Sequence, residues 1–264
     1  MRAGGPVVVV RGGGEMASAA ARLLFLCRMP VLVLERALPL AVRRRVCFAE
    51  AVRSGACSVE GVPGRRVEEP RPVADAVAVL VDPEGECLAG LAPGVLVDGR
   101  MAKRNLGTRR EQATFVVGLG PGFVAGRDVH AVVETQRGPG LGRVVWEGAA
   151  QPDTGRPEPV LGHDDGRVLR APQAGVFRSR ACLGDLVEKG AVVGAVGEAP
   201  VIAAIAGRLR GLLADGVPAD AGMKVGDVDP RGAIIDPSAV SDKARTVAAG
   251  VLEAIVTDLM KRDQ

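Results

Sequence analysis

Val7–Ala17 reads VVVVRGGGEMA, an apolar run that enters three glycines and continues as a helical pattern. Apolar residues recur at helical spacing from residue 15 to residue 28, and Val31–Glu35 is a second apolar run. A strand, a glycine turn, a helix and a second strand within about 30 residues predict a βαβ unit with a right-handed crossover.

The pattern continues as α/β up to residue 159. Apolar runs at residues 77–82, 95–99, 114–117, 130–134 and 144–146 predict strands, and short helices are expected over 39–45, 48–53 and 83–92. We therefore expect a Rossmann-like parallel or mixed sheet with helices on its faces. A helix predicted over residues 241–261 has an apolar stripe that should pack back onto this domain.

Residues 160–231 contain an internal repeat. Ala174–Arg178 aligns with Ala206–Arg210 at an offset of 32 residues (206 − 174), and several glycines keep this register. The repeat looks like the barrel-sandwich hybrid of biotinyl and lipoyl carrier domains. The stretch between its halves, residues 197–202, has no lysine, and Lys224 lies too late in the second half, so neither biotin nor lipoate is expected.

The predicted fold class is therefore α/β with an inserted all-β domain. We expect a Rossmann-like nucleotide- or cofactor-binding domain over residues 1–159 and an unmodified, lipoyl-like barrel-sandwich hybrid over 160–231. Residues 232–264 should form a C-terminal helix that returns to the first domain.

The composition excludes several classes of protein. A net charge of +3 over 264 residues is too small to indicate nucleic-acid binding. Two histidines and five scattered cysteines without a C-x-x-C pair predict no metal site and no disulfide framework. Neither a signal peptide nor a membrane-spanning run is present, so a cytoplasmic protein that contacts no membrane is expected.

The first glycine turn matches the dinucleotide fingerprint, with Ala17 in its last place. Glu35 ends the next strand, 21 residues after Gly14 (35 − 14), where its carboxylate could accept hydrogen bonds from a ribose and repel a 2′-phosphate. This favours NAD over NADP, although such turns also join strand to helix without a ligand. The cofactor-binding candidates here are Gly12, Gly13, Gly14, Ala17 and Glu35.

A second apolar strand runs into glycines at Phe115–Phe123, which reads FVVGLGPGF. Glycine turns after strands bare main-chain amides that can hold an anion. Two such turns predict one nucleotide-like ligand between them, with Gly118, Gly120 and Gly122 as further binding candidates.

Charged residues near these turns add candidates. Asp98 ends a predicted strand, and Arg100 and Lys103 could bind phosphate oxygens, unless the loop is a solvated basic loop. Arg43 and Arg44 lie on a predicted helix and could reach a nucleotide edge or simply face solvent.

The catalytic residues are not determined by the pattern. On a strand, Asp128, His130 and Glu134 would share a face, so His130 could shuttle a proton or be a structural histidine. The catalytic candidates are His130, Glu134 and Asp98, and spacing yields no Ser/His/Asp or Cys/His set.

Several blocks resemble the selenium-dependent molybdenum hydroxylase system proteins, the YqeB-type family, which is distantly related to xanthine dehydrogenase accessory proteins. The blocks are GGGEMA at 12–17 with Glu35, PLAVRR at 39–44, VDGRMAK at 97–103, VGLGPGF at 117–123, DVHAVVET at 128–135, GDVDPR at 226–231 and SDKA at 241–244. The chain departs from the family at Gly99, where Ala is expected, and at Gly138-Pro139, where Gly-His is expected. None of its cysteines lies in these blocks as a sulfur or selenium carrier.

The resemblance implies an accessory protein rather than a turnover enzyme. It would bind a nucleotide or a molybdopterin-type cofactor and help mature a selenium-dependent molybdenum hydroxylase. The candidate cofactors are the molybdenum cofactor, as molybdopterin or its dinucleotide, and NAD or an adenine nucleotide. The expected partners are the apo-hydroxylase or other maturation factors and a small anionic ligand, and a homo-oligomer stays open.

Two alternative functions remain at this stage. One is an NAD- or nucleotide-dependent enzyme, either an oxidoreductase or a nucleotidyl transferase, in which His130 or Asp98 would act on a proton or a metal. The other is a docking module without a small ligand, which would use residues 160–231.

Overall fold

The computed structural model describes residues 5–155, 160–163 and 165–262 and divides the chain into two compact units. Unit 1 comprises Met1–Ala37, Val46–Asp153 and Val240–Gln264, and unit 2 comprises Leu38–Arg45 and Thr154–Ala239. The domain boundary expected at residue 159 lies outside the described residues. The C-terminal helix belongs to unit 1, and the short segment 38–45 belongs to unit 2 rather than to the first domain.

Unit 1 is built on a nine-stranded sheet with the order β10-β9-β7-β6-β1-β2-β5-β4-β3. Its seven central strands are parallel: β4 (Val62–Val67), β5 (Val77–Val81), β2 (Val31–Glu35), β1 (Val8–Arg11), β6 (Val95–Asp98), β7 (Phe115–Leu119) and β9 (Ala131–Val133). The edge strands β3 (Ala56–Val59) and β10 (Val144–Val145) are antiparallel to their neighbours. A two-stranded ribbon of β8 (Val124–Ala125) and β11 (Gly148–Ala149) accompanies the sheet.

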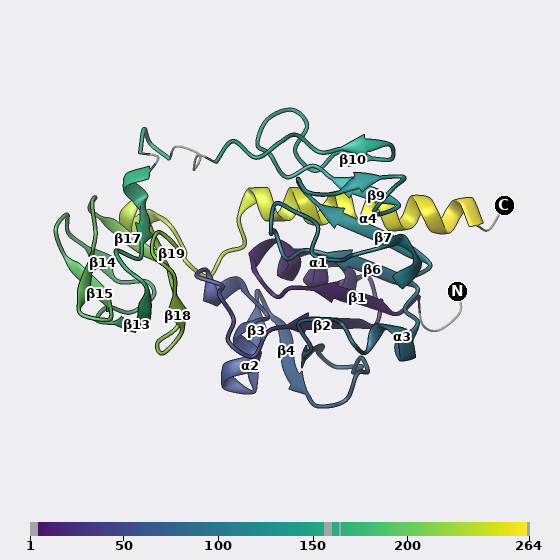
Figure 1. Ribbon diagram of the computed structural model, residues 1–264, viewed down its shortest axis with the longest axis horizontal. Coiled ribbons are helices and arrows are strands. Elements are labelled where there is room, and N and C mark those ends of the chain that lie inside the picture. Colours follow the sequence, from purple (N-terminus) through teal and green to yellow (C-terminus); the bar gives the residue numbers. More distant parts are fainter. Residues whose placement is uncertain (1–4, 156–159, 164, 263–264) are drawn as a thin grey trace. The chain divides into compact units, whose positions relative to one another are not determined.

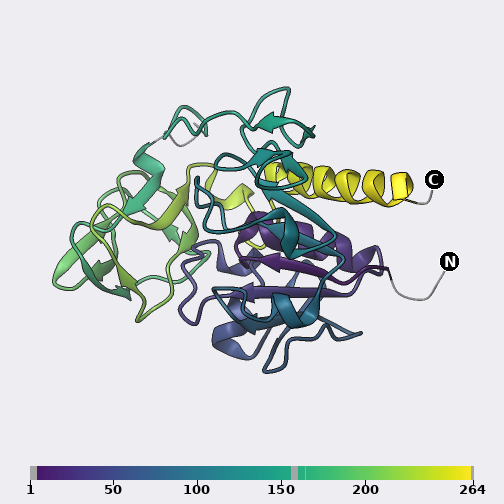
Figure 2. The same cartoon turned by 45° about the vertical axis from the view of Figure 1, so that its right-hand side comes forward.

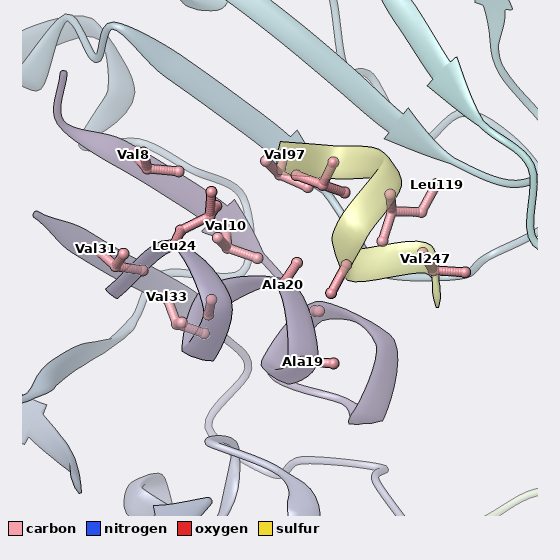
Figure 3. Close-up of a cluster of buried hydrophobic side chains, with 14 of the residues drawn as sticks. Val8, Val10, Ala19, Ala20, Leu24, Val31, Val33, Val97, Leu119 and Val247 are labelled. Atoms are coloured by element: carbon pink, nitrogen blue, oxygen red, sulfur yellow. The ribbon is translucent and has the colours of Figure 1, made fainter. Parts of the chain in front are cut away.

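The two long helices of unit 1 lie side by side on one face of this sheet (Figures 1 and 2). They are α1 (Glu15–Leu26) and α4 (Asp242–Arg262). The alanine side chains of α1 are small, so α4 can pack closely against it. Figure 3 shows Leu24 and Val247 in one cluster with valines of β1, β2 and β6. Each fully buried valine or leucine there stabilises the fold by about 1.5–3 kcal/mol.

The opposite face of the sheet has little helical cover. Alternate residues such as Val9, Leu32 and Leu96 point to that face and are buried. The chain between β5 and β6 forms only the four-residue helix α3 (Leu88–Leu91), and between β6 and β7 only the 3-10 turn η2 (Arg110–Gln112). Loops, rather than crossover helices, therefore cover this face.

The predicted Rossmann-like class is wrong for unit 1. The helix expected over 83–92 shrinks to α3, since Gly85 adopts a φ of +75° and breaks the helical path. Residues 39–45 form no helix beyond the start of the 3-10 turn η1 (Arg44–Val46), and residues 48–53 give only the short α2 (Glu50–Ser54). A mixed nine-stranded sheet with one helix-bearing face replaces the expected alternation of strands and helices.

Unit 2 consists of two four-stranded sheets. The first has the order β12-β19-β17-β14 and the second β16-β15-β13-β18. Their strands are β12 (Val168–Arg170), β13 (Gly175–Ser179), β14 (Leu186–Val187), β15 (Val192–Val196), β16 (Ala199–Ile202), β17 (Gly207–Leu212), β18 (Pro218–Ala219) and β19 (Lys224–Asp229). β13, β14 and β15 recur as β17, β18 and β19 at an offset of 32 residues (207 − 175), so the repeat in the sequence is a repeat of strands.

Among the described residues, no helix combines the length and the apolar character that a membrane span needs.

Candidate functional site

The first glycine turn is engaged by the chain itself at Gly12 and Gly13. The main-chain amide of Gly13 donates a 2.8 Å hydrogen bond to Oε2 of Glu35, and the amide of Gly12 donates to the carbonyl of Leu34. A side chain at Gly13 would meet the main chain of Ala49 at 2.7 Å, whereas one at Gly14 would meet open space. The carboxylate expected to hold a ribose thus binds the turn itself.

The second glycine turn is closed at all three glycines. A Cβ at Gly118 would lie 2.5 Å from the ring of Phe123, and one at Gly120 would collide with Thr135. Gly122 has a φ of +106°, and a Cβ there would lie 2.6 Å from the Cα of Arg104. These glycines allow close packing of the chain and do not form a ligand cradle.

Both turns press on one loop, residues 99–108, which we call loop 99–108. A Cβ at Gly12 would lie 3.1 Å from the Cα of Arg100, and Gly122 touches the other side of the loop. Within it, Met101 and Lys103 have φ values of +55° and +61°. Left-handed backbone at residues other than glycine costs about 1–2 kcal/mol each, so the glycine turns hold this loop in a strained path.

A buried charge network lies at the carboxyl end of β1 and β6, where Arg11 and Asp98 are neighbours in register. Asp98 is 1% exposed and accepts hydrogen bonds from Nε and Nη2 of Arg100, at 3.1 and 2.6 Å, and from the hydroxyl of Thr108 at 2.5 Å. Arg11, 2% exposed, donates from Nη1 to the same hydroxyl. Burial lowers the pKa of Arg11, and the Arg100 charge lowers it further.

Arg11 also reaches the chain after β5. Its Nη2 donates to the carbonyls of Pro83 and Glu84, at 3.3 and 3.0 Å. Asp82 holds the same turn by accepting the amides of Gly85, Glu86 and Cys87 at 2.9–3.0 Å. Burial alone would raise the pKa of Asp82, but the amide hydrogen bonds lower it overall.

These two segments form the walls of a groove of about 650 Å³. One wall contains residues 85, 86, 88, 89, 92 and 93, and the other contains residue 109 and residues 111–114. Leu88, Ala89, Pro93 and Ala113 contribute apolar surface to this lining. We call this cavity the α3–η2 groove.

The rim of the α3–η2 groove has charges of both signs. Arg109, Glu86 and Glu111 are exposed there. Among the described residues, none of the three forms an ion pair with another residue. The guanidinium group of Arg11 lies near Gly85, where a Cβ would be 3.6 Å from its central carbon. The buried Nε of Arg11 has no hydrogen-bond partner in the described chain.

The structure does not bring His130 and Glu134 together. His130 precedes β9, and its Nδ1 accepts the amide of Val116 at 3.0 Å, so this nitrogen has no lone pair free to act as a base. Burial lowers its pKa, and the charge of Arg110 lowers it further. Glu134 follows β9 at the other end and accepts the amides of Thr135, Gln136 and Gln151 at 2.7 Å.

The other predicted residues are dispersed. Asp128 accepts the amide of Val124 beside β8, and Lys103 pairs with Asp153 at 2.6 Å on the surface. Arg43 and Arg44 belong to unit 2. No group of three His, Cys, Asp or Glu side chains suited to a metal ion occurs in the part of the chain that the structure describes.

Sequence reasoning missed Arg11, Asp82 and Thr108. Two of them had a signal: Arg11 ends a run of four valines, and Asp82 directly follows a buried strand. A charged residue in that position is either solvated or held by partners, and the partners of Arg11 come from segments distant in sequence. The groove residues had no signal, because their apolar side chains are ordinary for a short helix and a loop.

No family model matches the chain. A protein of Escherichia coli (strain K12) named "Uncharacterized protein YqeB" is 45% identical over 258 residues, which are 96% of this chain and 48% of that protein. The chain therefore spans about half the length of the curated relative it matches, and the resemblance to the selenium-dependent molybdenum hydroxylase system family stays a prediction.

Solved structures align at low similarity. They include an aspartoacylase family protein from Mesorhizobium loti (15% identity, 85% of each chain, TM-score 0.27). A second is the ectoine utilization protein EutE (DoeB) from Ruegeria pomeroyi (13% identity, 85% of this chain and 86% of that one, TM-score 0.26). A third is a succinylglutamate desuccinylase/aspartoacylase from Rhodobacter sphaeroides (16% identity, 85% of each chain, TM-score 0.25). Scores this low assign no activity to this chain.

These findings correct the predicted function. The aligned structures bear aspartoacylase and desuccinylase names, not those of maturation factors, nucleotide-binding proteins or biotinyl and lipoyl carriers. The predictions of a molybdenum hydroxylase maturation function, of a nucleotide-dependent enzyme and of a barrel-sandwich unit 2 find no match among these structures and are not retained. The geometry of the two glycine turns also argues against a nucleotide site. The amide of Gly13 donates to Glu35, and side chains or backbone pack against the glycines of the second turn.

Proposed function

We propose that unit 1 binds a small amphipathic molecule in the α3–η2 groove, in the simplest case an amino acid with an apolar side chain. The observation that carries the proposal is that Arg11 binds the chain next to both walls of the groove. It donates to the carbonyls of Pro83 and Glu84, just before Gly85, and to the hydroxyl of Thr108, just before Arg109.

The size and lining of the groove fit such a ligand. Small-molecule sites have volumes of roughly 300–1,000 Å³ and are mostly apolar with a few polar groups, and the groove measures about 650 Å³. The apolar lining residues suit an aliphatic side chain. Arg109 offers a donor pair to a carboxylate, and Glu86 and Glu111 offer acceptors to an ammonium group.

The charges of the ligand can be tested one at a time. Calorimetry with leucine, N-acetyl-leucine and leucine amide compares a zwitterion with ligands that keep only one charge. A charge-assisted hydrogen bond contributes about 1.5–3 kcal/mol, so leucine should bind about tenfold or more tightly than either derivative.

Two pairs of variants locate the site. Ala89→Phe fills the groove and should abolish binding, whereas Ala74→Phe, on an exposed loop of unit 1, should leave it unchanged. Arg109→Ala should weaken leucine to the level of leucine amide, with Arg71→Ala as its matched control. Equal binding by wild type and Ala89→Phe, or none by wild type, would contradict the proposal.

A further inference from the structure

The α3 wall of the α3–η2 groove carries acidic side chains and no basic ones. Residues 82–93 include Asp82, Glu84 and Glu86, and their sequence contains no Lys, Arg or His. The carboxylate of Asp82 accepts three amides of its own turn, whereas Glu86 is exposed and lines the groove. Glu86 therefore brings a negative charge to the groove from a wall that has no cation to neutralise it.

The η2 wall carries charges of both signs on one turn. The amide of Arg109 donates to Oε1 of Gln112 at 2.9 Å, and the amide of Gln112 donates to the carbonyl of Arg109 at 3.2 Å. This turn holds Arg109 and Glu111 two residues apart, and both are exposed and line the groove. A cation and an anion on one turn match the carboxylate and the ammonium group of an α-amino acid.

The groove therefore has one more charge than an amino acid such as leucine can match. Its lining carries one positive charge, on Arg109, and two negative charges, on Glu86 and Glu111. The carboxylate of leucine can pair with Arg109 and its ammonium group with one glutamate. The other glutamate then has no partner on the ligand, and a second ammonium group would supply that partner.

We propose that the α3–η2 groove prefers an α-amino acid whose side chain ends in an ammonium group, of the lysine or ornithine type. The inference rests on the proposed function and specifies its ligand. Arg109 binds the carboxylate, Glu111 binds the α-ammonium group, and Glu86, on the opposite wall, binds the ammonium group of the side chain. The methylene groups between the two ends contact apolar lining residues such as Leu88 and Ala113.

The test is calorimetry of the full chain with lysine and norleucine, which have the same carbon chain and differ by the second ammonium group. An exposed ion pair is worth up to about fivefold in affinity, so lysine should bind at least about twofold more tightly than norleucine. Without a carboxylate to receive it, the ammonium group would lose hydration and lysine would bind more weakly. The sign of the difference therefore decides. Sodium chloride should reduce the advantage of lysine.

A pair of variants locates the second ammonium site. Glu86→Gln keeps the size of the side chain and removes its charge, so the ratio of the association constants of lysine and norleucine should fall to about one or below. Glu147→Gln, an exposed glutamate of the same unit, is the matched control and should keep the wild-type ratio. The melting temperature of Glu86→Gln without ligand should change little, because the amide of Glu86, not its carboxylate, binds Asp82.

The outcomes separate this inference from the proposed function. Norleucine binding as tightly as lysine or more tightly in wild type, or the wild-type ratio in Glu86→Gln, would overturn the inference and leave the proposed function standing. Absence of binding by both amino acids would overturn the proposed function and the inference together.

Discussion

The buried charges of unit 1 and those of unit 2 differ in what their arginines bind. In unit 1, Asp98 accepts three side-chain donors. Arg11 donates from Nη1 to Thr108 and from Nη2 to two carbonyls, while its Nε has no partner among the described residues. In unit 2, Arg210 and Lys224 share carboxylates that other arginines bind more closely. The first network positions backbone, whereas in the second each carboxylate is shared between two cations.

The largest effect is expected from Asp98→Ala. The substitution leaves Arg11 and Arg100 without their buried counter-ion, and breaking a buried pair costs about 3–5 kcal/mol. Urea denaturation should show this loss, whereas Asp75→Ala, which removes an exposed partner of Arg65, should cost about 1 kcal/mol or less. Similar losses for the two variants would mean that the Asp98 network does not position the walls.

The second effect separates a clash from backbone strain. Gly122 and Gly126 both have positive φ, so alanine at either position costs about 1–2 kcal/mol. At Gly122 the new Cβ also collides with the backbone of Arg104, which adds about 1–3 kcal/mol, while at Gly126 it meets nothing within 4 Å. Equal losses of unfolding free energy would show that the second turn has room for a side chain.

A third variant tests what Glu35 does. Glu35→Ala leaves the amide of Gly13 without its acceptor, which should cost about 1–3 kcal/mol. The exposed Glu147→Ala is the control and should be neutral. If Glu35 instead served a ribose, the variant would keep its stability, and NAD would raise the melting temperature of wild type only.

The smallest effect concerns pH. Since burial lowers the pKa of His130 below the value of an unfolded histidine, about 6.5, the unfolded state binds more protons between the two values. Stability is therefore full above about pH 6.5 and falls as the pH drops towards the folded pKa. His130→Gln should flatten this decline in unfolding free energy, and His163→Gln, an exposed histidine, should not.

The sequence predicted the strands and the helix at the start of unit 1 better than it predicted the role of the glycine turns between them. The runs at Val8–Arg11 and Val31–Glu35 are strands on either side of α1 in the sequence, because short continuous apolar runs are typical of buried strands. The predicted role of the glycines was wrong. A glycine that leaves space for a phosphate and a glycine that allows the backbone of Arg104 to pack against it have the same appearance in a sequence. Arg11 illustrates the same limit, because its partners Pro83 and Thr108 lie 72 and 97 residues away.

Hydrogen exchange at the amide of Gly13, measured by NMR without any ligand, tests most directly whether the glycine turns are closed. The account predicts exchange at least about tenfold slower than in an unstructured chain, and loss of that protection in Glu35→Ala. Exchange at the unprotected rate in wild type would show that the amide is open to a guest, and would contradict the assignment of the turns to packing.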